Sequence, residues 1–222
     1  MSLYIADLWR YPVKSLAGER LPLSTLEPDG IAGDRIVRVR GPESVRTSRR
    51  HYRLLGLRGT LDEDGHARID DHPWQSAAAL ARVREAAGAD AWLEECRTLE
   101  RFDILPLLVA TDGAVAEFGR DVRRLRPNIV IGGVEGLAER DWPGATLRVG
   151  EAVIRLDSRR ARCAMTTVDP DTLQVNPEVL RDIVHRFGNQ LALNAEVVRG
   201  GVIRVGDPVT VTAPGCASSA RR

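Results

Sequence analysis

The sequence predicts an α+β fold that is mainly β, and three observations lead to it. Many short segments rich in apolar and β-branched residues are separated by Gly, Pro and Asp, which is the pattern of strands joined by turns. Only three segments carry helical signals. The chain has 222 residues, enough for one large or two small domains with a substantial core. We therefore expect a β-barrel-rich protein in two parts.

Strand candidates fill most of the first half of the chain. They lie at residues 3–10, 20–27, 35–41 and, as a hairpin around Asp64-Gly65, within 53–70. Pro28-Asp29-Gly30 ends the second candidate, because this tripeptide is a strong turn signal. Residues 74–88 change to Ala and Leu interspersed with Arg and Glu, which predicts a helix that ends at Gly88.

Further strand candidates occupy the second half. They lie at residues 102–110, 127–133, 145–158 and 191–212. Pro106 breaks the first of them, and the last is expected to turn back on itself as a hairpin at Gly200-Gly201. Residues 214–222 are small and polar, so we expect a disordered tail there.

Two more helices are predicted in this half. Thr111 and Asp112 are capping residues for a short helix within 113–124. The segment 176–188 carries the strongest helix signal of the chain, with Asn176 as cap, Pro177 at the first position and Gly188 after the end. Its apolar stripe consists of Val179, Leu180, Ile183, Val184 and Phe187.

Composition excludes several classes of protein. Hydrophobic residues make up 43% and charged residues 28% of the chain, and the net charge is +1, so nothing marks it as a nucleic-acid or membrane binder. No apolar run is long enough to span a bilayer, and the first residues lack a signal-peptide layout. We therefore expect a cytoplasmic protein with no nucleic-acid or membrane partner.

The cysteines and known nucleotide motifs exclude further classes. Cys96, Cys163 and Cys216 are odd in number and widely spaced, which argues against a disulfide framework. There is no Cys-x-x-Cys pair, no paired-histidine zinc motif, no Gly-rich dinucleotide fingerprint and no P-loop. The chain therefore has no evident way to take electrons from a nicotinamide cofactor by itself.

The densest polar stretch runs from Ser158 to Pro170 and contains Cys163 among several arginines. Nearby guanidinium groups favour the thiolate form, which attacks electrophiles and binds metals. The alternative is a buried cysteine on a core strand beside a solvated arginine face. The residues of this stretch alone leave both interpretations open.

Three other positions invite a binding role. Lys14 is the one lysine among the 32 lysine and arginine residues. Either it occurs there by chance, or the position needs a compact, flexible charge. Arg35 follows a glycine turn and can hold a phosphate, or else form a surface ion pair. Asn128 precedes a β-branched strand and can bind a heterocycle, or else satisfy a turn.

Six short motifs in this order resemble the MOSC domain family, named after the C-terminal domain of molybdenum cofactor sulfurase, with the β-barrel domain that often precedes MOSC. They are "YPVKSLAGE", "GDR", "RPNIVI", "DW…TLRVG", "RCAMTTVDP" and "GGVIRVGDPV", and they cover roughly residues 3–211. The combination of "YPVKS" with "RC…TTVDP" is similar to the branch of the mitochondrial amidoxime reducing component and its bacterial relatives. The resemblance implies an N-terminal β-barrel-like domain at 1–100 and a MOSC domain at 101–213.

The resemblance also implies a cofactor, the molybdenum cofactor (molybdopterin), and residues that hold it. Cys163 corresponds to the family's molybdenum ligand, which makes it both the metal-binding and the catalytic residue, and Arg162 lies beside it. Lys14 and Ser15 correspond to phosphate contacts. The remaining cofactor contacts implied by the motifs are Arg35, Asn128 and, as a looser match, Thr111.

Relatives of this branch reduce N-hydroxylated compounds such as amidoximes, hydroxylamines and hydroxamic acids. The resemblance therefore implies a molybdenum-dependent reductase that takes electrons from a separate electron-transfer protein. A carrier of the cofactor, or of sulfur as a persulfide on Cys163, is the alternative from a different class. A third alternative is a MOSC scaffold whose thiol is only packed and which binds something else.

Overall fold

The computed structural model describes residues 2–213 and has the mainly β, α+β architecture that the sequence predicts. The helices of the described residues are α1 (Ala77–Ala87), α2 (Asp112–Phe118) and α3 (Glu178–Phe187). The strands are β1 (Leu3–Arg10), β2 (Glu19–Leu21), β3 (Leu23–Glu27), β4 (Gly30–Ile31), β5 (Val37–Arg40), β6 (Gly59–Leu61), β7 (Ala67–Ile69), β8 (His72–Pro73), β9 (Trp92–Glu95), β10 (Leu107–Thr111), β11 (Ile129–Gly132), β12 (Thr146–Val149), β13 (Ala152–Ala161), β14 (Gln190–Arg199), β15 (Gly201–Arg204) and β16 (Pro208–Thr212). Short 3-10 helices are η1 (Tyr52–Gly56), η2 (Leu99–Arg101), η3 (Val122–Arg124), η4 (Ala138–Asp141) and η5 (Ala164–Thr167). The tail predicted at 214–222, with Cys216, lies outside the described residues.

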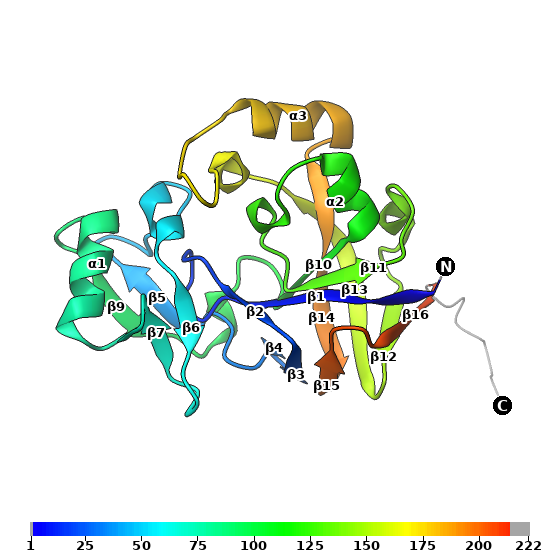
Figure 1. The fold of residues 1–222 in the computed structure, drawn as a ribbon, viewed down its shortest axis with the longest axis horizontal. Coiled ribbons are helices and arrows are strands. Elements are labelled where there is room, and N and C mark those ends of the chain that lie inside the picture. Colours follow the sequence, from blue (N-terminus) through cyan, green and yellow to red (C-terminus); the bar gives the residue numbers. More distant parts are fainter. Residues whose placement is uncertain (1, 214–222) are drawn as a thin grey trace.

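The largest sheet closes on itself into a barrel (Figure 1). Its strand order is β11-β10-β14-β13-β12-β16-β1-β2, and β1 pairs with β11 as well as with β16. Only β10 and β11 run parallel, and the other neighbours are antiparallel. Strand β1 therefore closes the ring, and β2 extends the sheet beyond it.

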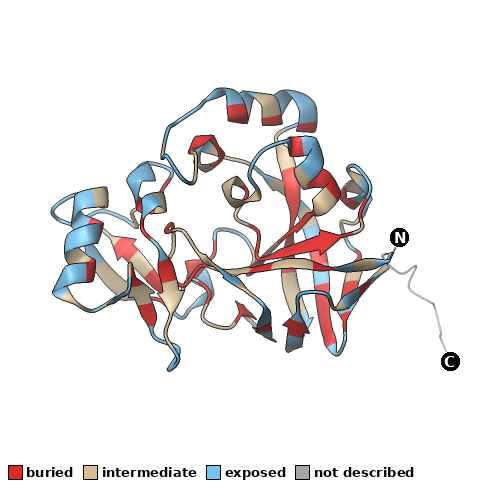
Figure 2. Ribbon diagram, viewed as in Figure 1, coloured by how far each residue is buried: buried red, intermediate tan, exposed pale blue. Residues whose placement is uncertain are grey.

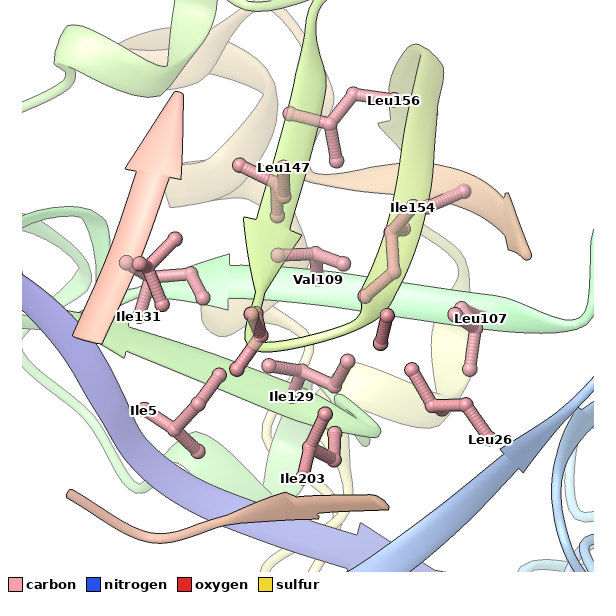
Figure 3. Close-up of a cluster of buried hydrophobic side chains, with 14 of the residues drawn as sticks. Ile5, Leu26, Leu107, Val109, Ile129, Ile131, Leu147, Ile154, Leu156 and Ile203 are labelled. Carbon is pink, nitrogen blue, oxygen red and sulfur yellow. The ribbon is translucent and has the colours of Figure 1, made fainter. Parts of the chain in front are cut away.

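Apolar side chains from alternate strand positions fill the barrel (Figure 3). On β10, Leu107 and Val109 point inward, and on β11, Ile129 and Ile131 do the same. Burying one such side chain contributes roughly 1.5–3 kcal/mol. The core also contains Ile5, Leu26, Leu147, Ile154, Leu156 and Ile203.

A second buried cluster lies in the lobe that contains α1, β5, β6, β7 and β9 (Figure 1). Helix α1 contributes Ala79, Val83 and Ala87, which are four residues apart and so share one face. Ser76 caps this helix by accepting a hydrogen bond from the amide of Ala79, and Gly88 follows its end, as predicted.

The first strands of the chain pack with the barrel and not with this lobe. Ile5 and Leu8 of β1, Leu26 of β3 and Ile31 of β4 belong to the barrel core. The domain boundary at residue 100 stays a prediction. These four residues precede that boundary, but they pack against core residues that follow it.

Helices α2 and α3 cover one end of the barrel region through a third cluster that joins Phe118 to Ile183 and Phe187. Their outward faces are exposed (Figure 2). Thr111 caps α2, and the Asn176 side chain accepts a hydrogen bond from the amide of Glu178 at the start of α3. Gly188 ends α3 with a positive φ of 60°. No helix among residues 2–213 combines the length and apolarity needed to cross a membrane.

Two details of the strand prediction are wrong. Gly200-Gly201 does not form a hairpin, because β14 pairs with β10 and β13 whereas β15 pairs with β3 in a separate sheet. A side chain at Gly200 would meet the Leu26 carbonyl oxygen at 2.5 Å, so glycine is needed for the crossing between sheets. Residues 102–106 are not strand; β10 begins after Pro106, and the preceding loop borders the site described next.

Candidate functional site

One cavity of about 190 Å³ brings together sequence segments that are far apart. Its walls come from the N-terminal lobe (residues 14–15, 35 and 47–49) and from the barrel region (residues 102–108, 124–128, 160–165 and 194). Of the predicted site residues, the lining includes Lys14, Ser15, Arg35, Asn128, Arg162 and Cys163. Their contact with a cofactor stays a prediction, but their meeting in one cavity is a property of the fold.

Cys163 lies just after the end of β13 and is partly exposed on this cavity. Its backbone carbonyl accepts hydrogen bonds from the amide of Thr166 at 3.0 Å and from the Thr166 hydroxyl at 2.9 Å. The Thr167 hydroxyl donates to the Ala164 carbonyl at 2.6 Å, which closes the same turn, η5. The alternative of a cysteine buried in a strand core is therefore wrong for Cys163. Cys96, which directly follows β9, is the buried thiol and is 6% exposed.

The cavity is strongly cationic. Asp103 is the one carboxylate among the described lining residues. Opposing it are Lys14, Arg35, Arg49, Arg124, Arg126, Arg160 and Arg162. Such an excess of positive charge in a concave site favours an anionic ligand.

Asp103 is held by three of these cations. Its carboxylate lies 2.9 Å from the Lys14 ammonium, 2.8 Å from Arg49 and 3.4 Å from Arg160. Burial raises the pKa of Asp103, but the Lys14 hydrogen bond and the charges of Lys14, Arg49 and Arg160 outweigh burial and hold that pKa below its ordinary value. Lys14 also donates to the Arg101 carbonyl at 2.9 Å, so two of its three protons have protein partners.

Two arginines of the cavity have no carboxylate partner among the described residues. Arg162 donates to the Leu125 carbonyl at 2.7 Å, and its buried Nε–H has no acceptor. Arg126 forms no ion pair within residues 2–213 and lies over the Tyr11 ring, 4.2 Å from its centroid. Burial lowers the pKa of each guanidinium to about 10, so both remain charged at neutral pH. These are the groups that an incoming anion would satisfy.

Asn128 and Arg35 are tied into a buried hydrogen-bond network at the back of the cavity. The Asn128 side-chain oxygen accepts from the Leu108 amide at 3.1 Å, and its nitrogen donates to Asp34 at 3.3 Å. Asp34 is fully buried, accepts from the Tyr11 amide at 2.7 Å and pairs with the Arg35 guanidinium. This network joins β1, the "GDR" turn and β11, so it fixes the cavity wall as well as presenting polar groups to it.

Three of the eight described non-glycine residues with a positive φ line this cavity. Ser15, Arg35 and Arg126 have φ values of 74°, 54° and 57°, in the left-handed region that side chains other than glycine rarely adopt. Each such conformation costs on the order of 1–3 kcal/mol and persists where the surrounding structure imposes it, which is typical of binding sites.

The structure does not bring Thr111 to the cavity. Its hydroxyl is fully buried, accepts from the amide of Ala114 to cap α2 and donates to Glu139 at 3.2 Å. The Thr111 hydroxyl thus both donates and accepts a hydrogen bond inside the protein. Its role in capping α2 explains the residue, and the structure gives no support for Thr111 as a cofactor contact.

Sequence reasoning missed several lining residues, above all Arg49, Asp103 and Arg126. Arg126 directly precedes the "PN" of a quoted motif, and that adjacency was the available signal. Arg160 belongs to the polar stretch 158–170 and lines the cavity together with Arg162. No local pattern distinguishes Arg49 from the many exposed arginines of the chain.

Two family models match the chain. The MOSC N-terminal beta barrel domain matches residues 2–116, and the MOSC domain matches residues 111–210. The protein belongs to the MOSC family. The two matches of this MOSC protein meet at residues 111–116, somewhat later than the predicted boundary.

Among curated proteins, this MOSC protein is similar to the amidoxime reducing components. It is 27% identical over 126 residues to mitochondrial amidoxime reducing component 2 of Macaca fascicularis, covering 48% of this chain and 37% of the relative. It is 33% identical over 76 residues to mitochondrial amidoxime-reducing component 1 of Homo sapiens, covering 32% of this chain and 22% of the relative. The aligned region thus spans less than half the length of each curated relative.

Among solved structures, the YUAD protein from Bacillus subtilis shares the fold. The two align with a TM-score of 0.50 at 12% identity, over 95% of this chain and 96% of the other. This similarity bears on the architecture of the MOSC protein and not on its activity.

Proposed function

We propose that this MOSC protein binds the molybdenum cofactor and reduces N-hydroxylated small molecules with electrons from a separate electron-transfer protein. One observation carries the proposal: a single cationic cavity is lined by Lys14, Ser15, Arg35, Asn128, Arg162 and Cys163. The similarity to amidoxime reducing components supports the substrate class of amidoximes, hydroxylamines and hydroxamic acids.

The residues of the cavity fit such a cofactor. Cys163 offers a soft sulfur donor, which suits a metal already bound by other sulfur atoms. Arg126 and Arg162 line the cavity without a carboxylate partner among the described residues, so their positive charges are available to an anion. The donor set therefore matches a ligand that combines a soft metal with a phosphate group.

In this proposal each residue has a distinct task. Cys163 would ligate molybdenum; Lys14, Ser15 and Arg35 would hold the phosphate; and Asn128 and Arg162 would contact the ring system. When bound, the cofactor supplies two-electron redox chemistry that the side chains lack. The protein contributes a rigid wall, through the Asn128–Asp34–Arg35 network, and positive charge that retains the anion.

The proposed reaction requires a source of electrons and a source of protons. Reducing an amidoxime to an amidine breaks the N–O bond, consumes two electrons and two protons, and releases water. The electrons come from the partner protein. Asp169 does not serve as the proton donor in this proposal, because hydrogen bonds from the amides of Thr172 and Asp171, from the Thr172 hydroxyl and the charge of Arg124 lower its pKa and keep it ionised.

Metal analysis tests the proposal. The protein is produced in a host that makes molybdenum cofactor, and molybdenum and pterin are quantified in the pure protein. We expect close to one molybdenum per chain, lost in Cys163→Ala and retained in Cys96→Ala, since Cys96 is buried away from the cavity. Molybdenum retained in Cys163→Ala would contradict the assignment of the ligand.

A turnover assay separates the reductase from the carrier. Reduction of benzamidoxime with an artificial electron donor is expected for the loaded protein. The free, partly exposed thiol of Cys163 also suits a carrier. Persulfide on Cys163 without bound metal, or bound cofactor without turnover for several donors, would favour that second function.

A further inference from the structure

The motif "RCAMTTVDP" extends beyond the thiol, and its last residues have no task in the proposed function. Cys163 is its second residue, whereas Thr166 and Asp169 follow three and six positions later. The 3-10 helix η5 lies between Cys163 and Asp169, and both of its threonines are buried. A motif that continues past its reactive residue calls for a role for the residues that follow.

Arg124 of η3 connects this later part of the motif to another segment of the chain. Its side chain is 10% exposed; its Nη1 donates to the Thr166 carbonyl at 3.2 Å, and its Nη2 donates to the Asp169 carboxylate at 2.7 Å. Thr166 in turn donates its amide and its hydroxyl to the Cys163 carbonyl. Because both end nitrogens have fixed acceptors, the guanidinium links η3 to the turn that carries Cys163.

The Asp169 carboxylate is itself held in one orientation. Its Oδ1 accepts hydrogen bonds from the amides of Asp171 and Thr172, at 3.1 and 2.9 Å, and from the Thr172 hydroxyl at 3.1 Å. The Asp169 amide donates to the Gln174 carbonyl at 2.9 Å. One carboxylate oxygen is therefore fixed by the loop after η5, which leaves Oδ2 directed toward Arg124.

The same η3 region also contacts the residue that precedes Cys163. The Leu125 carbonyl accepts a hydrogen bond from the Arg162 guanidinium at 2.7 Å. Leu125 is 1% exposed and belongs to the third buried cluster, so this region is anchored in the protein core. Two adjacent residues, Arg124 and Leu125, thus bind the chain on both sides of Cys163.

Arg124 lines the cavity with Cys163, but it differs there from Arg126. Arg126 forms no ion pair within residues 2–213, whereas the charge of Arg124 is neutralised by Asp169 and its end nitrogens bond to the turn. An anion in the cavity would therefore gain less from Arg124 than from Arg126. The contacts of Arg124 suit it to hold the turn and not to hold a ligand.

We propose that Arg124 and Asp169 are positioning residues, which together brace the η5 turn and keep the Cys163 sulfur at the cavity wall. Groups that orient a metal ligand typically contribute about 10–100-fold to metal affinity, so a ligand on a short turn benefits from such a brace. The inference rests on the proposed function only for what the sulfur binds. The brace itself is a property of the metal-free chain.

Thiol modification of the metal-free full chain tests the brace. Iodoacetamide is small and N-(1-pyrenyl)maleimide is bulky; both are uncharged and both react with the thiolate, so the ratio of their rates reports access and not protonation. The rates are read on the Cys163 peptide by mass spectrometry. A loosened turn admits the bulky reagent, so we expect Arg124→Met to raise the bulky-to-small ratio by roughly fivefold or more.

Three further variants give the test its controls. Arg123→Met is the matched control, because Arg123 is adjacent and bonds to Asp171 at 2.8 and 2.7 Å but to no described residue of η5, so the ratio should not change. Arg124→Lys keeps the charge but can reach only one of the two partners, so its ratio should lie between those of Arg124→Met and the unmodified protein. Asp169→Asn keeps the acceptor for the loop and removes the charge, so a rise of about twofold is expected.

The outcomes separate the brace from its alternatives. An unchanged ratio in Arg124→Met and Asp169→Asn would overturn the brace, and a rise of equal size in Arg123→Met would show that the effect is not specific to Arg124. Pyrophosphate affinity lowered about tenfold in Arg124→Met, with an unchanged ratio, would instead make Arg124 a ligand-binding residue. If Arg124→Met does not fold, Arg124→Lys and Asp169→Asn still decide the matter.

Molybdenum content keeps this proposal apart from the proposed function. Both reagents act on the metal-free chain, so absence of molybdenum from the unmodified protein after expression in a cofactor-producing host would reject the proposed function and leave the brace standing. Stoichiometric molybdenum in the unmodified protein, together with an unchanged ratio in Arg124→Met and Asp169→Asn, would reject the brace and leave the proposed function standing.

Discussion

Arg101 is buried and Arg162 is half-buried in the cavity wall, and the folded protein satisfies the hydrogen-bond donors of the two guanidinium groups to different degrees. Arg101 is 3% exposed and donates to the carbonyls of Asp34 and Arg97 at 3.1 and 2.6 Å, and it pairs with the Asp29 carboxylate. Arg162 reaches one carbonyl and leaves its Nε–H without an acceptor. The two arginines therefore differ in the number of satisfied donors as well as in exposure, and the donor count identifies Arg101 as the structural one.

The largest effect is expected when the satisfied arginine is removed. Arg101→Met leaves the Asp29 carboxylate and several carbonyls without their donor, so we expect the free energy of unfolding to fall by about 3–5 kcal/mol in urea denaturation. The control is Arg181→Met, which removes an exposed ion pair with Glu178 and should change the free energy of unfolding by about 0.5 kcal/mol or less. A loss below about 1 kcal/mol for Arg101→Met would contradict the structural role.

The same substitution at the unsatisfied arginine should act in the opposite way. Arg162→Met removes a buried charge that no carboxylate compensates, so the free energy of unfolding should stay the same or rise by up to about 2 kcal/mol. Affinity for pyrophosphate, measured by calorimetry, should fall roughly tenfold because a charged donor is lost. Destabilisation comparable to that of Arg101→Met would remove the distinction between the two residues.

Asp103 tests the same idea from the side of the anion, because its carboxylate already neutralises three cations of the cavity. Asp103→Asn frees Lys14, Arg49 and Arg160, so pyrophosphate should bind about fivefold more tightly. The pKa of Asp103 is lowered, so the difference should persist from pH 8 down to pH 5 and shrink only as the pH falls through that lowered pKa. Glu196→Gln breaks a surface pair with Arg155 and should leave the affinity unchanged; weaker binding in Asp103→Asn would show that the carboxylate organises the site instead.

Glu139 extends the comparison to a buried acid and should give the smallest effect. It is 3% exposed, and burial raises its pKa despite hydrogen bonds from its own backbone and from Thr111. Its stabilising, protonated form is fully present below the unfolded-state pKa and is lost as the pH rises through the raised native pKa. Glu139→Gln should therefore raise the free energy of unfolding by about 1 kcal/mol at pH 7 and have little effect near pH 4. An equal change in the free energy of unfolding at pH 7 and pH 4 would contradict the ionisation of Glu139 between these pH values.

Much of the site could be predicted because its residues stand in short motifs that resemble a known family. Lys14 and Cys163 are 149 positions apart, and no periodicity connects them; the resemblance led to both, and the structure brings them to one cavity. Arg49 and Asp103 lie in loops whose positions depend on the packing of the lobe against the barrel. No local pattern encodes that packing, so these residues could not be selected from the sequence.

The fold could be predicted at the level of elements and less well at the level of pairing. The end signal at Gly88 and the capping signals at Thr111 and Asn176 locate three helices correctly, because such signals act within a few residues. Gly200-Gly201 has the composition of a hairpin turn, but β14 and β15 join different sheets. Which strands pair is decided by the burial of Ile203 beside Leu26, far away in the chain, and a turn signal carries no information about it.

The closure of the barrel has a consequence for biosynthesis. Leu3 of β1 pairs with Val209 of β16, so the first and the last strand of the described residues bond to each other. Strand β1 can pair with β2 and β11 earlier, but its pairing with β16 at Leu3 and Tyr4 can form only after residue 209 has been made. The ring therefore stays open between β1 and β16 until nearly all of the described residues have been made, and an open ring leaves unpaired peptide groups at its edge.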